Sequence, residues 1–76
     1  MTQGIWRIES SITAWHEETA GDFATAYTET LAHSIGSNGI DTFKLYNSNN
    51  ELAASVRKGW PVWVAEKYRD NLYAKS

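Results

Sequence analysis

The sequence predicts a small α+β domain in which a three-stranded, mainly antiparallel sheet has two helices packed on one face, in the order β-α-β-β-α. Three observations support this fold class. Apolar and polar residues alternate in three short segments, and apolar residues recur at three- and four-residue steps in two others. The length of 76 residues leaves room for one hydrophobic core. We therefore expect residues 1–76 to form a single α+β domain.

The first predicted strand lies in GIWRIESSITAW, residues 4–15. Trp6, Ile8 and Ile12 share one parity, and the polar residues Arg7, Glu9, Ser11 and Thr13 share the other, which is typical of a strand with one buried and one wet face. Ser10 falls on the apolar parity and interrupts it. The pattern therefore predicts a bulge or a break near residues 10–12.

The first helix is predicted to run from about residue 19 or 22 to residue 35. Its apolar residues recur on one side: Phe23, Ala24, Tyr27, Leu31 and Ile35. The opposite side carries Asp22, Ala26, Glu29 and His33. Thr19 or Asp22 can cap the start of the helix, and Gly36 suits a left-handed end followed by a turn at residues 37–39.

The second half of the chain predicts a hairpin and a closing helix. Two alternating segments, residues 40–46 and 51–57, flank the turn-rich sequence NSNN, and Gly59 ends the second segment. Pro61 suits the first position of a helix, where its missing N–H has no partner to lose. Val64 and Tyr68 would then face the sheet, and Trp63 would point away from it.

Composition narrows the possible functions. The chain has no cysteine, which removes disulfides, thiolate metal sites and cysteine nucleophiles. No apolar run approaches the roughly 20 residues of a membrane span. These features predict a cytoplasmic protein. The two histidines, His16 and His33, lack metal-ligand spacing, and no motif frames a catalytic serine. We expect no enzyme activity, catalytic residue, metal or cofactor.

Two surfaces are candidates for binding. An aromatic and cationic patch is predicted around the last helix, and it comprises Trp63, Lys67, Arg69 and Tyr73, extended by Arg57 and Lys58. An alternative acidic patch comprises Glu17, Glu18, Asp22 and Glu29. The charge is unevenly distributed, because residues 1–38 carry one base against five acids, whereas residues 39–76 carry six bases against four acids.

In size, acidity, lack of cysteine and richness in aromatic residues, the chain resembles small accessory proteins of phages and mobile elements, such as anti-CRISPR proteins and other host-takeover inhibitors. The resemblance implies a non-enzymatic module that binds another protein or protein complex and blocks it by occluding a surface, in the host cytoplasm if the chain is phage-encoded. Two alternatives stay open. One is a nucleic-acid-binding accessory module that uses the basic, aromatic second half, which the acidic pI of about 5.5 makes less favoured. The other is a self-associating structural protein, such as a homodimer.

Overall fold

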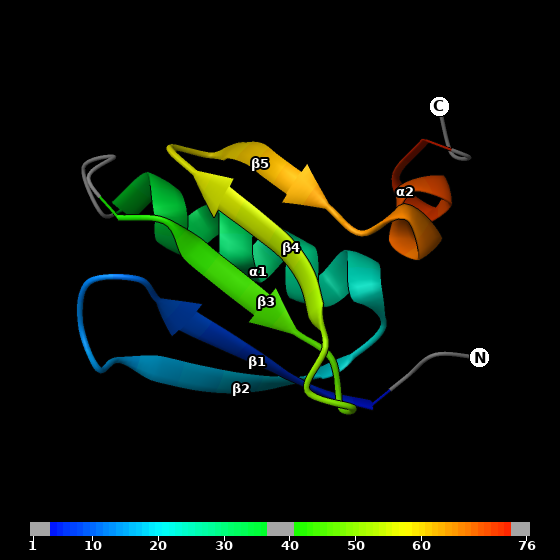
Figure 1. Cartoon of the computed structure of the whole chain (residues 1–76), viewed down its shortest axis with the longest axis horizontal. Coiled ribbons are helices and arrows are strands. Elements are labelled where there is room, and N and C mark those ends of the chain that lie inside the picture. Colours follow the sequence, from blue (N-terminus) through cyan, green and yellow to red (C-terminus); the bar gives the residue numbers. More distant parts are fainter. Residues whose placement is uncertain (1–3, 37–40, 74–76) are drawn as a thin grey trace.

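The computed structural model describes residues 4–36 and 41–73, and over these residues the chain forms one five-stranded antiparallel sheet and two helices (Figure 1). The elements are β1 (Gly4–Ser10), β2 (His16–Gly21), α1 (Phe23–Gly36), β3 (Phe43–Tyr46), β4 (Leu52–Arg57), β5 (Trp60–Val64) and α2 (Glu66–Tyr73). The α+β class and the antiparallel sheet are confirmed. The predicted three strands and the order β-α-β-β-α are wrong, because the structure adds β2 and β5.

The strands lie in the order β2-β1-β3-β4-β5, so that β2 and β5 form the two edges of the sheet (Figure 1). Every neighbouring pair is antiparallel. In β1, Ile8 pairs with Glu17 of β2 on one side and with Leu45 of β3 on the other. The first strand of the sequence therefore lies inside the sheet, although its partner β3 comes after α1.

The break predicted near residues 10–12 is confirmed, since β1 ends at Ser10. The chain then turns back to form β2, a strand that the sequence pattern did not predict. Trp6 and Ile8 are buried as expected, but Ile12 lies in the loop after β1 and is 60% exposed. The loop is closed by a hydrogen bond of 3.2 Å from the Ser10 N–H to the carbonyl oxygen of Trp15.

The prediction that Pro61 begins the last helix is wrong. Lys58 and Gly59 have φ values of 56° and 80°, and two successive positive φ values are what a type I′ hairpin turn requires. The turn directs the chain back along β4, so that Pro61 lies in edge strand β5 opposite Val56. Proline is tolerated on an edge strand, and the last helix begins only at Glu66.

Helix α1 begins and ends close to the predicted positions. The Asp22 side chain accepts a 2.9 Å hydrogen bond from the Thr25 N–H, which confirms Asp22 as the cap. The buried residues are Phe23, Ala26, Tyr27, Thr30 and Ser34, so Ala26 is wrongly placed by the sequence pattern. Ile35 is 66% exposed instead of buried. Gly36 is the last helical residue and has no left-handed φ, and the turn predicted at residues 37–39 lies outside the described residues.

The core lies between the sheet and both helices, and aromatic rings fill its centre. Phe23 of α1 stacks on Tyr68 of α2 at 4.7 Å between ring centroids, and Trp6 of β1 meets both rings edge-on. The Tyr68 hydroxyl accepts a 3.0 Å hydrogen bond from Asn47 Nδ2 in the β3–β4 turn. Rings from both helices therefore meet the buried side of β1 at Trp6. Neither described helix combines the length and apolarity needed to cross a bilayer.

Candidate functional site

Within residues 4–36 and 41–73, no helix covers the face of the sheet opposite α1, which we call the open face (Figure 1). Cross-strand partners share a face, so the pairings Glu9–Lys44, Lys44–Ser55 and Ser55–Trp63 form one row across β1, β3, β4 and β5. Ile8, Leu45 and Ala54, which alternate with this row, are fully buried on the α1 side. Trp63 therefore lies on the open face at the edge of the sheet, and not on the outside of a helix.

Exposed apolar side chains gather along β5. Trp60 is 74% exposed, Val62 63% and Trp63 43%. Ile35, at the end of α1, reaches the same edge, because a Cβ built on Gly59 would lie 2.8 Å from Ile35 Cγ1. We call the set Ile35, Trp60, Val62 and Trp63 the β5 ridge. Exposed apolar side chains that gather in one region mark an interaction site more often than scattered single residues do.

The β5 ridge is flanked by positive charge. Arg57 pairs with Trp60 across the hairpin and shares its face, and Lys58 occupies the turn. The segment 52–65 contains these two bases and no acid. The turn is attached to α1 by a 2.8 Å hydrogen bond from the Gly59 N–H to Ser34 Oγ. The structure therefore brings Trp63, Arg57 and Lys58 of the predicted aromatic patch to one edge of the sheet.

The other members of that patch, Lys67, Arg69 and Tyr73, belong to helix α2 and not to the β5 ridge. Lys67 Nζ donates to Glu51 Oε1 at 2.8 Å. This contact raises the pKa of Lys67 and, together with an Asn47 hydrogen bond, lowers the pKa of Glu51. Arg69 Nε donates to the carbonyl oxygen of Val64 at 2.9 Å. The side chain of Tyr73 lies outside the described residues.

The acidic residues do not form one surface. Glu17 faces the helix side of β2, where its carboxylate lies 3.6 Å from His33 Nε2, whereas Glu18 faces the open side opposite Arg7. Asp22 caps α1. Glu29 Oε1 is buried and has no hydrogen-bond partner among the described residues. The sheet therefore separates Glu18 from the other three carboxylates.

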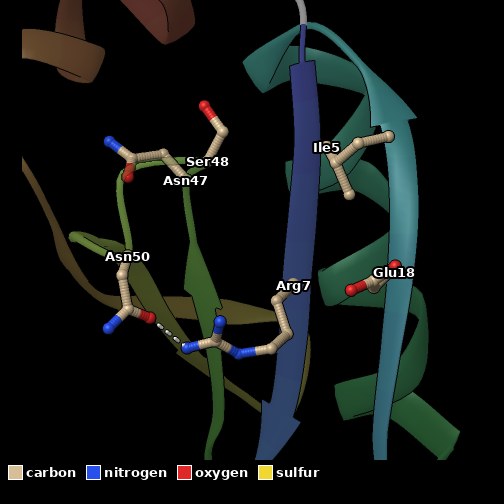
Figure 2. Close-up of a pocket in the computed structure, with 6 residues that line it drawn as sticks. All are labelled: Ile5, Arg7, Glu18, Asn47, Ser48 and Asn50. Atoms are coloured by element: carbon tan, nitrogen blue, oxygen red, sulfur yellow. Dashed lines mark hydrogen bonds between the residues drawn. The ribbon is translucent and has the colours of Figure 1, made fainter.

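A shallow depression lies on the open face at the end of the sheet near β2, far from β5. It has a volume of about 280 Å³ and is lined by Ile5, Arg7, Glu18, Asn47, Ser48 and Asn50 (Figure 2). Arg7 donates to the Asn50 side chain at 2.5 Å and lies over the Tyr46 ring at 4.6 Å. Its guanidinium also pairs with Glu9. These contacts hold Arg7 within the protein's own network.

Asp41 forms a buried polar cluster that the sequence did not predict. It is 5% exposed and accepts hydrogen bonds from the Ser10 hydroxyl and from both the N–H and the hydroxyl of Ser11. Burial alone would raise its pKa, but these hydrogen bonds and one from the Thr42 backbone lower it below the usual value. The cluster holds the β1–β2 loop. Among the residues that the structure describes, no three His, Asp or Glu side chains gather where they could hold a metal ion.

The sequence pattern did not identify Ile35, Trp60 or Val62 as members of a surface patch. The available signal was the run WPVWV, rich in β-branched and aromatic residues, which suits a strand better than a helix. Comparisons of the chain with protein-family models, curated proteins and solved structures find no match.

Proposed function

We propose that this chain is a small non-enzymatic protein-binding module whose docking surface is the β5 ridge with Arg57 and Lys58. The observation that supports the proposal is the exposure of Trp60, Val62 and Trp63 side by side on an edge strand. Tryptophan and arginine dominate the energetics of protein interfaces, where a few central residues carry most of the binding energy. Two tryptophans beside an arginine are such a set.

The module acts by occlusion. Because a rigid sheet holds the ridge in place, little of its backbone and few of its side chains have to become ordered on docking. The conformational entropy lost on docking is therefore small. The target has an apolar recess that receives the ridge. Carboxylates at the rim of that recess pair with the bases beside the ridge. In keeping with the resemblance to phage and mobile-element accessory proteins, we propose a host complex as the target, blocked where the module sits.

The test is capture of partners from a lysate of the natural host with the wild-type chain and matched variants. We expect one stoichiometric partner with wild type, and its loss with Trp60→Ala, since truncating a hot-spot tryptophan costs 2 kcal/mol or more, about 30-fold in affinity. Ile12→Ala is the control, because Ile12 is equally an exposed apolar residue but lies in the β1–β2 loop. Retention of the partner by Trp60→Ala would refute the ridge as the docking surface.

Nucleic-acid binding is the weaker alternative. Lys44, Arg57 and two tryptophans do lie on the open face, but Glu9 and Glu18 share it. Carboxylates repel phosphates, and a binding face for nucleic acid normally has a clear excess of bases. A labelled oligonucleotide should therefore show no saturable change in fluorescence anisotropy at low salt. Saturable binding with a linear fall of log affinity against log salt would favour the alternative.

A further inference from the structure

The turn between β4 and β5 is attached to the C-terminal end of helix α1, and the two lie at the same end of the molecule (Figure 1). The Gly59 N–H donates a 2.8 Å hydrogen bond to Ser34 Oγ. The Ser34 hydroxyl donates in turn to the carbonyl oxygen of Leu31 at 2.7 Å, and the Ser34 side chain is fully buried. One buried hydroxyl therefore joins the turn to the last part of the helix.

Gly59 allows this attachment in two ways. Its φ of 80° lies in the left-handed region, which glycine adopts without steric cost. A Cβ at this position would lie 2.8 Å from Ile35 Cγ1, whereas carbon atoms pack at about 3.5–4.0 Å. The backbone of the turn therefore lies directly against the end of α1, beside Ser34 on its polar side and Ile35 on its apolar side.

The position of Trp60 depends on this turn because little else holds it. Trp60 follows Gly59 directly in the chain, and β5 is an edge strand that lies beside β4 alone in the sheet. The Trp60 side chain is 74% exposed, and among the described residues no other aromatic ring packs against it. The backbone between β4 and β5 therefore sets the direction of this side chain.

We propose that Ser34 is a positioning residue for the β5 ridge, because it fixes the β4–β5 turn on α1 and thereby holds Trp60 in the direction in which a target meets it. The inference rests on the proposed function, since it assigns a further residue to the same docking surface. Ser34 acts through Gly59, because a fully buried side chain cannot itself touch a docked protein. The attachment supplies in advance the order that a flexible turn would have to acquire on docking.

Helix α1 contains a matched control for this hydroxyl. Thr30 is also fully buried, and its Oγ1 donates to the carbonyl oxygen of Ala26 at 2.7 Å, within the helix itself. Ser34→Ala and Thr30→Val each remove one buried hydroxyl from α1 and change little else in the shape of the side chain. Both variants should lower the stability of the fold. Only Ser34→Ala should also loosen the β4–β5 turn.

The first test needs no target and uses amide hydrogen exchange and NMR relaxation of the full chain. In Ser34→Ala, exchange of the Gly59 amide should accelerate about fivefold or more relative to the slowest-exchanging amides, because its acceptor is lost. The indole N–H of Trp60 should become more mobile on the ps–ns timescale. Thr30→Val should leave both readouts unchanged. Circular dichroism shows whether each variant is folded; if Ser34→Ala is not, Ser34→Cys takes its place, since a thiol is only a weak acceptor.

The second test is competition for the partner that immobilised wild type captures from the host lysate. Soluble Ser34→Ala should be needed at about three- to tenfold higher concentration than soluble wild type to release half of the partner, because a smaller fraction of it holds the turn in the binding conformation. Soluble Thr30→Val should compete as well as wild type. Soluble Trp60→Ala should compete poorly, because it lacks the ridge tryptophan itself.

Unchanged exchange of the Gly59 amide in Ser34→Ala would overturn the inference, because the turn would then keep its place without the hydroxyl. Equal effects of Thr30→Val would overturn it as well, since they would reflect lower stability alone.

The competition experiment separates the two proposals. If Trp60→Ala competes poorly but Ser34→Ala competes as well as wild type, only the role of Ser34 is refuted. If Trp60→Ala also competes as well as wild type, the ridge is not the docking surface, and the proposed function fails together with the role of Ser34 in docking.

Discussion

Replacing Lys58 by asparagine should stabilise the fold. Lys58 holds a φ of 56° in the β4–β5 turn. An ordinary residue in this left-handed region pays about 1–2 kcal/mol, whereas asparagine occupies it readily and is favoured at this position of type I′ turns. We therefore expect Lys58→Asn to raise the free energy of unfolding by about 1 kcal/mol. In a domain of this size that corresponds to a rise in Tm of roughly 4–8 °C.

The measurement is urea and thermal unfolding followed by circular dichroism, at concentrations where the chain is monomeric. The urea midpoint should rise while the slope m stays constant, since the surface exposed on unfolding does not change. Lys44→Asn is the matched control. Lys44 lies in the extended strand β3, where asparagine is disfavoured, so this variant should gain nothing. An unchanged or lower Tm for Lys58→Asn, or an equal rise for the control, would refute the turn argument.

Three further substitutions test separate contacts. Tyr68→Phe removes the hydroxyl that accepts from Asn47 and should lower the free energy of unfolding in urea by about 1 kcal/mol, whereas no loss would show that α2 does not depend on this bond. The native pKa of Asp41 lies below its usual 3.8, so just below that pH the unfolded chain binds more protons than the native chain. The free energy of unfolding should therefore fall as the pH drops from about 4. Asp41→Asn should flatten this fall in urea titrations across that range. Lys67→Ala breaks an ion pair whose side chains are more than half exposed, so its urea midpoint should stay close to that of wild type. A clearly lower midpoint would show that the pair with Glu51 positions α2.

The parts of the fold that the sequence predicted well are those whose local pattern agrees with their burial. The Trp6–Ile8 parity identifies the buried face of β1, and the Asp22 cap identifies the start of α1. Tyr68 was correctly assigned to the core, although its helix begins later than predicted. In each case one element presents a consistent apolar face, so the local signal and the tertiary structure coincide.

The two missed strands are edge strands, and their formation depends on tertiary pairing. β2 reads HEETAG, which has no apolar face, and it exists because β1 offers backbone partners. β5 contains a proline, and its apolar residues continue the helical spacing of the segment that follows it. Pairing with β4 overrides that pattern. The turn between β4 and β5 contains Lys-Gly instead of the more recognisable Asn-Gly, so the hairpin signal was weak. The binding surface was misplaced for the same reason, because the ridge exists only when β5 is a strand.

The strand order also has a consequence for how the chain folds. Strands β1 and β2, with α1, are neighbours in sequence, and so are β3, β4 and β5 with α2. Among the described elements, the pairing of β1 with β3 is the strand contact that joins these two halves. Each half can form its hairpins early, but Trp6 and Phe23 meet Tyr68 only when the halves meet. We expect the rate of folding to be set by closure of the β1–β3 seam, and two fragments divided between α1 and β3 to recover native structure only when mixed.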